Sequence, residues 1–115
     1  INVARVQLLQ QTPAKALPLL QRALAIQEKA SGLMGLELAP VLDLLGEAAR
    51  SEYPGDTEMY WKRSLAVRES NHGPAGLEVT ETLDRLGQFY FEAKSLDKAA
   101  ATLERALYIL SLIHI

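Results

Sequence analysis

The chain has 115 residues, of which 49% are hydrophobic and 23% charged, and its formal net charge is −2 at pH 7. This composition is that of an ordinary soluble domain, and it excludes a highly charged disordered chain and the strongly basic surface typical of nucleic-acid binding. The absence of cysteine excludes disulfide bonds and thiolate metal sites. No apolar run approaches the roughly 20 residues of a membrane-spanning helix. We expect neither a nucleic acid nor a membrane as partner, and the lack of cysteine fits a cytoplasmic protein.

Apolar residues recur at three- and four-residue steps along the chain, which predicts helices. Their boundaries are marked by proline and glycine at Thr12-Pro13, Gly32, Pro54-Gly55 and Gly73-Pro74. In chain order, the expected helices are residues 2–11, 13–30, 36–51, 56–71, 77–93 and 96–110.

These helices belong to a repeat. Arg22, Arg63 and Arg105 are 41 and 42 residues apart. Gly35-Leu36-Glu37-Leu38 matches Gly76-Leu77-Glu78-Val79 at the same offset of 41 residues. A constant period over whole units indicates an array, here 1–109, with a partial first repeat at 1–31, a second at 36–71 and a third at 77–109.

The third repeat reads Leu83-x-x-Leu86-Gly87-x-x-Tyr90 and then Ala99-x-x-x-Leu103-x-x-Ala106, which resembles the tetratricopeptide repeat. The period of about 42 residues and the stretch that begins at Arg22 are similar to the long-repeat branch found in kinesin light chains and nephrocystin-like proteins. The resemblance implies an all-α fold, a right-handed superhelix (α-solenoid) of antiparallel helix pairs, with six helices in this chain.

Small and bulky residues alternate at matching positions of the repeats. Gly46 and Gly87 allow helix backbones to approach, while Trp61 and Leu103 fill the space opposite. The residues expected to be buried are Leu45, Gly46, Trp61, Leu86, Gly87 and Leu103.

The three repeated arginines allow two interpretations. Arg22, Arg63 and Arg105 could bind phosphate or an acidic partner. Glu or Gln lies near each of them in the sequence, however, so a solvated outer face of mixed charge is the favoured interpretation.

Catalytic patterns are absent from the sequence. The two histidines, His72 and His114, are far apart, and there is neither a His-x-x-x-His pair nor a glycine-rich phosphate loop. We therefore expect no enzyme, no metal and no cofactor.

The first helix of each repeat lines the concave groove in arrays of this kind. Helical spacing places the groove side chains at Asp43, Glu47 and Arg50 in one repeat and at Asp84, Gln88 and Phe91 in the next, with Pro40 and Glu81 beside them. Because these carboxylates would repel an acidic peptide, the sequence predicts a protein or peptide partner of basic or amphipathic character. Phe91 would supply an apolar contact and Arg50 an orienting charge.

The expected function is therefore that of a protein–protein interaction scaffold. Two alternatives stay open, a structural spacer or self-assembly module, and an accessory repeat array of a larger signalling or enzymatic protein.

The last six residues, 110–115, read Leu-Ser-Leu-Ile-His-Ile and lose the polar side of the preceding helix. They are similar, letter for letter, to a translation of the transposon-end adapter used in preparing sequencing libraries. We expect a fragment whose residues 110–115 are a non-native tail without function.

Overall fold

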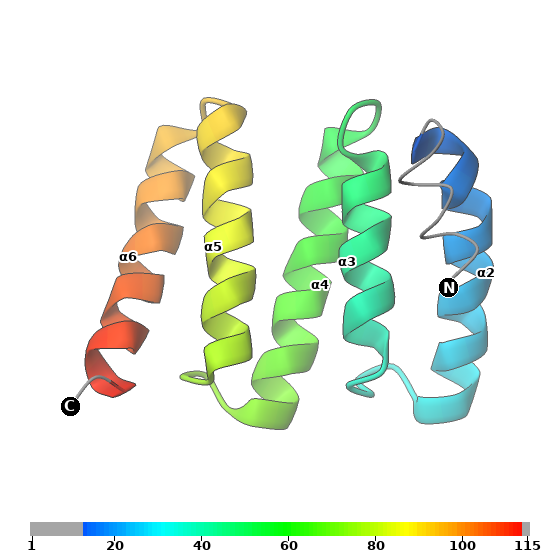
Figure 1. Ribbon diagram of the computed structural model, residues 1–115, viewed down its shortest axis with the longest axis horizontal. Coiled ribbons are helices and arrows are strands. Elements are labelled where there is room, and N and C mark those ends of the chain that lie inside the picture. The colour runs from blue at the N-terminus through cyan, green and yellow to red at the C-terminus, as the bar shows by residue number, and fades with distance from the viewer. Residues whose placement is uncertain (1–12, 114–115) are drawn as a thin grey trace. The chain divides into compact units, whose positions relative to one another are not determined.

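The computed structural model describes residues 13–113, which form five α-helices and no strand (Figure 1). The helices are α2 (Pro13–Ser31), α3 (Leu38–Ala49), α4 (Pro54–His72), α5 (Leu77–Glu92) and α6 (Leu96–Ile113). The prediction of an all-helical chain is confirmed for these residues; α3 runs opposite to α2, and α6 runs opposite to α5. The helix expected at 2–11 lies outside the described residues.

Two compact units make up the chain, Ile1–Val67 and Arg68–Ile115, and their boundary falls inside α4. In the first unit α3 packs against α2, and in the second α5 packs against α6. Each unit thus contains a pair of helices that pack against each other.

The core of the first unit comes from the apolar stripes of α2 and α3. One cluster joins Leu20 of α2 to Val41 and Leu45 of α3, and all three side chains are buried. A second cluster is centred on Leu38, Leu42 and Val67. In the second unit the buried side chains again recur at helical steps, at Val79, Leu83, Leu86, Ala99, Ala106 and Ile109.

Close packing of glycine against a bulky side chain is confirmed in both units. The Trp61 indole lies so near Gly46 that a Cβ there would collide with it, and Leu103 lies in the same way against Gly87. Trp61 is 1% exposed, and its Nε1 donates to the Asp43 carbonyl oxygen at 3.1 Å. The prediction that Leu103 is buried was wrong: it is only half-buried. Leu20, at the matching position of α2, is buried because Val41 and Leu45 of α3 pack over it, whereas Leu103 borders an open hollow between α5 and α6.

The helix ends follow the glycines. Gly32 and Gly73, directly after α2 and α4, have φ of 81° and 84°, a left-handed conformation that costs glycine little. Their amides donate to the carbonyl oxygens of Glu28 and Glu69, each at 2.9 Å.

The end of α5 has no glycine in the left-handed position, unlike the ends of α2 and α4. Lys94 takes the left-handed position with φ of 63°, and Ser95 N donates to Tyr90 O at 2.8 Å, as in a Schellman motif. No non-glycine residue in the turn after α3 has positive φ. The two turns therefore differ in shape.

Residues 110–113 continue α6 as helix, and Leu112 is 55% exposed there.

Candidate protein-interaction surface

The polar side of α3 carries the first set of predicted groove residues. Glu47 is exposed, whereas Asp43 is half-buried. The Asp43 carboxylate accepts a hydrogen bond from Ser64 Oγ of α4 at 2.7 Å. Asp43 is thus engaged inside its own unit, which leaves Glu47 as the more accessible of the two carboxylates.

Arg50 follows directly after the last residue of α3. Its guanidinium carbon lies 5.8 Å from the centroid of the Trp61 ring, a cation–π contact, and its Nη1 lies 3.6 Å from the Glu47 carboxylate. Because its guanidinium lies over the buried Trp61 ring, Arg50 contributes to the packing of the first unit and is less available to a partner.

In the second unit the predicted residues are more open. Asp84 and Gln88 are exposed along α5, and Phe91 near its end is 64% exposed. Glu81, one turn before Asp84, is exposed as well. An apolar ring and two carboxylates thus share the accessible side of one helix.

Beside Glu81 and Asp84 lies an open hollow of about 440 Å³ between α5 and α6. Its α6 wall is apolar and carries Leu103, Ala106, Leu107 and Leu110. Leu107 is 66% exposed. In the first unit Trp61 and Ser64 take the positions of Leu103 and Ala106, and both donate hydrogen bonds to Asp43.

Sequence reasoning missed this hollow. Leu103 and Ala106 repeat the pair Leu20 and Ala23, which is packed against α3, so the sequence carries no signal that distinguishes the two places. Only the structure shows whether a helix packs over the pair.

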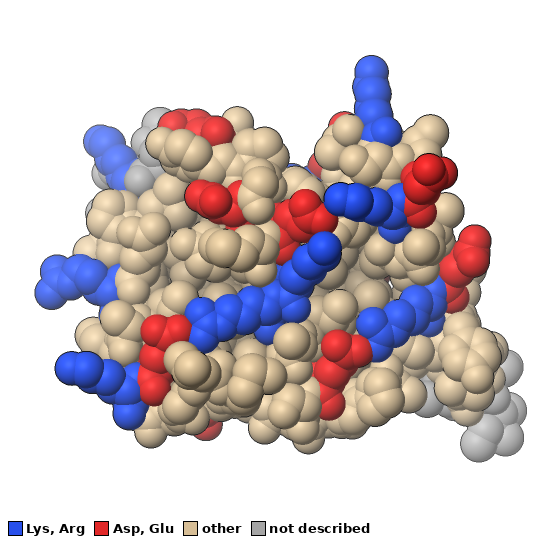
Figure 2. All heavy atoms as spheres, turned by 180° about the vertical axis from the view of Figure 1, so that it is seen from behind, with Lys and Arg blue, Asp and Glu red and all other residues tan. Residues whose placement is uncertain are grey.

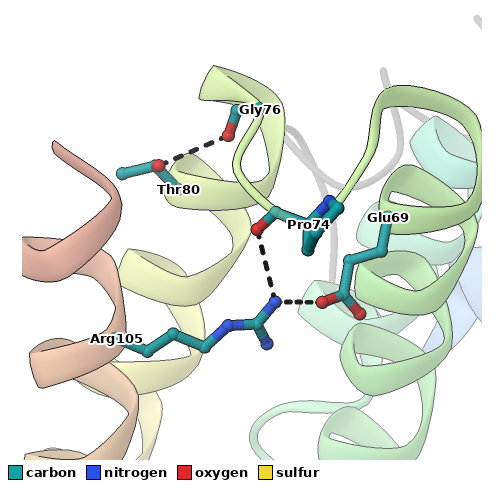
Figure 3. A network of polar contacts seen from close by, with 5 residues as sticks. All are labelled: Glu69, Pro74, Gly76, Thr80 and Arg105. Carbon is teal, nitrogen blue, oxygen red and sulfur yellow. Dashed lines mark hydrogen bonds and ion pairs between the residues drawn. The ribbon is translucent and has the colours of Figure 1, made fainter. Parts of the chain in front are cut away.

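The repeated arginines Arg22, Arg63 and Arg105, here called the arginine ladder, lie on the second helices of the repeats, and two of them form ion pairs. Arg63 Nη2 of α4 lies 2.5 Å from Glu28 Oε2 of α2. Arg105 of α6 makes the same ion pair with Glu69 of α4 and also approaches the Pro74 carbonyl oxygen, at 3.5 Å (Figure 3). On the face seen in Figure 2, basic groups lie beside acidic ones. This agrees with a mixed-charge face for Arg63 and Arg105; Arg22 is exposed.

Among the described residues, no group of three or more His, Asp or Glu side chains is placed to hold a metal ion. Within residues 13–113 no helix combines the length and apolarity needed to cross a membrane.

The described part of the chain thus defines an all-α protein whose antiparallel helices carry a repeated packing pattern. No model of a known protein family matches the chain, and no curated protein matches it. The resemblance to the tetratricopeptide repeat stays a prediction from the residues quoted above.

Proposed function

We propose that this chain is a tetratricopeptide-type array that acts as a protein–protein interaction scaffold. In this proposal the first helices of successive repeats, α3 and α5, line one concave groove of a right-handed superhelix. The groove binds a basic or amphipathic peptide segment of a partner protein.

One contrast between the helices carries the proposal. On the second helices, Arg63 and Arg105 are neutralised by glutamates of a neighbouring helix. On the first helices, Asp84 and Gln88 are exposed, and the Glu47 side chain stays 54% exposed although it lies 3.6 Å from Arg50. A partner would therefore meet accessible carboxylates on α3 and α5, and it would have to displace existing ion pairs to reach the arginines.

The chemistry of the partner follows from these groups. Glu47, Glu81 and Asp84 attract lysine and arginine, and Phe91 offers an apolar contact near the end of α5. Asp43 and Arg50 play a smaller part than the sequence predicts, because Ser64 and Trp61 engage them.

Binding of matched peptides tests the proposal. Two fluorescent, proline-containing peptides would be compared, one rich in lysine and one in which glutamate replaces every lysine. The chain is expected to bind the lysine peptide, and the double variant Glu47→Lys with Asp84→Lys to lose that binding. Arg22→Gln, a change on the exposed side of α2, serves as the control and is expected to bind as the unchanged chain does.

Tighter binding of the glutamate peptide would overturn the proposed charge preference, and retention of binding by the double variant would overturn the groove. Self-assembly, the rival function, predicts instead that the mass measured by light scattering rises with protein concentration.

A further inference from the structure

The hollow between α5 and α6 combines an apolar floor with an acidic edge. Leu103, Ala106 and Leu107 follow one another along α6 at helical steps, and Glu81 and Asp84 stand on α5 at the edge. In this stripe Leu103 is half-buried and Ala106 is buried, whereas Leu107 is 66% exposed. This is a preformed apolar strip with negative charge along one side.

The first unit shows what such a strip accommodates. Through the repeat, Leu103, Ala106 and Leu107 of α6 correspond to Leu20, Ala23 and Leu24 of α2. On α2 these three side chains pack against Val41, Leu45 and Ala48, the apolar stripe of helix α3. Leu20 is consequently fully buried and Leu24 half-buried, whereas their counterparts on α6 are half-buried and exposed. A helix laid across the strip is thus a packing that this chain already uses.

The acidic edge restricts which helix fits. The accessible charges on α3 and α5 and at the start of α3 are mostly carboxylates, among them Glu47, Glu78 and Glu37, the residue directly before α3. A helix with the pattern of α3 or α5 would therefore bring like charges towards Glu81 and Asp84. A helix with lysine or arginine beside its apolar stripe would gain attraction at the same place.

We infer that this hollow is a docking site for one amphipathic helix of a partner protein, with aliphatic residues at three- and four-residue steps and lysine or arginine flanking them. The inference rests on the proposed scaffold function and gives it a second site with its own ligand class. The aliphatic side chains would cover Leu103, Ala106 and Leu107, and the basic groups would lie against Glu81 and Asp84.

A synthetic peptide provides the probe. It carries the sequence of residues 36–51, which contains the stripe of α3, with Glu37→Lys, Asp43→Lys and Glu47→Lys. Binding to the full 115-residue chain would be measured by fluorescence anisotropy, and the contact site by chemical-shift changes in isotope-labelled protein. Shifts are expected at Glu81, Asp84 and Leu107, together with a gain of helical circular dichroism, because so short a helix forms mainly on binding.

Protein variants separate the apolar and charged parts of the site. Leu107→Gln is expected to weaken binding about tenfold, and Glu81→Gln with Asp84→Asn about threefold at low salt. Ile26→Gln on α2 is the matched control: Ile26 and Leu107 are both 66% exposed, and Ile26 does not line the hollow.

Three results would overturn the inference: no binding of the lysine peptide, binding that Leu107→Gln leaves unchanged, or tighter binding of the unmodified 36–51 peptide. The last would show that the strip prefers a helix of the chain's own repeat. The extended lysine peptide of the preceding section keeps the two proposals apart. If it binds and responds to Glu47→Lys with Asp84→Lys while the helical probe fails, the groove stands and the hollow does not. If only the helical probe binds, the hollow is supported as a docking site and the groove is not.

Discussion

Arg63 lies 2.5 Å from the carboxylate of Glu28, and in the second unit Arg105 pairs in the same way with Glu69. The backbone carbonyl oxygen of each glutamate also accepts a hydrogen bond from the amide of the glycine that follows its helix, Gly32 or Gly73. One residue therefore both caps its own helix and holds a neighbouring one. This explains why arginine, glutamate and glycine recur together with the period of the repeat.

A double-mutant cycle with Arg63→Gln and Glu28→Gln is expected to give a coupling energy of about 0.5 kcal/mol, since both side chains are roughly 30% exposed to water. The free energy of unfolding would be measured in urea from the fluorescence of Trp61, the one tryptophan of the chain. Added salt should reduce the coupling. Lys62 and Glu58, 3.3 Å apart within α4, form the control pair, and a smaller coupling is expected because the Lys62 side chain is 59% exposed. A coupling energy of zero for Arg63 and Glu28 would contradict a stabilising role for the ion pair between α4 and α2.

Gly46→Ala is expected to lower the free energy of unfolding by about 2–3 kcal/mol, because the new methyl group would overlap the buried Trp61 ring. Gly87→Ala should cost less, since the end of the Leu103 side chain can rotate away. Gly55→Ala is the control: nothing lies within 4 Å of a Cβ there, and alanine favours the helix. Urea unfolding would rank the three, and equal stability of Gly46→Ala and Gly55→Ala would contradict the packing described.

Lys94→Gly is expected to raise the free energy of unfolding by about 1 kcal/mol, because it relieves the left-handed conformation of a residue with a Cβ. Lys94→Ala keeps the Cβ and should bring no comparable gain. Thermal unfolding of the three proteins measures the difference. A gain from alanine as large as that from glycine would indicate that the lysine side chain, rather than the backbone, is responsible.

The sequence predicts the helices and much of their packing. Gly32 and Gly73 mark helix ends because few other residues adopt positive φ at low cost. The pairing of Gly46 with Trp61 was predictable because glycine and a bulky residue recur at the same places in the repeat.

The accessible surface was predicted less well. Helical spacing places Asp43 and Arg50 on a common side of the first helix, but it does not tell whether a side chain reaches across to a neighbour, as both do towards α4. Leu103 shows a second limit. Its position in the repeat is that of the buried Leu20, yet Leu103 borders a hollow that only the packed structure reveals.

The central claim, that a basic segment binds along the first helices, is tested most directly by paramagnetic relaxation. The lysine-rich extended peptide would carry a nitroxide on an added cysteine, and the chain itself has no cysteine that could take the label. Backbone amides near Glu47 and Gln88 are expected to lose the most intensity in the complex, and those near Arg63 and Arg105 the least. Strongest losses at Arg63 and Arg105, or uniform losses along the chain, would contradict the account.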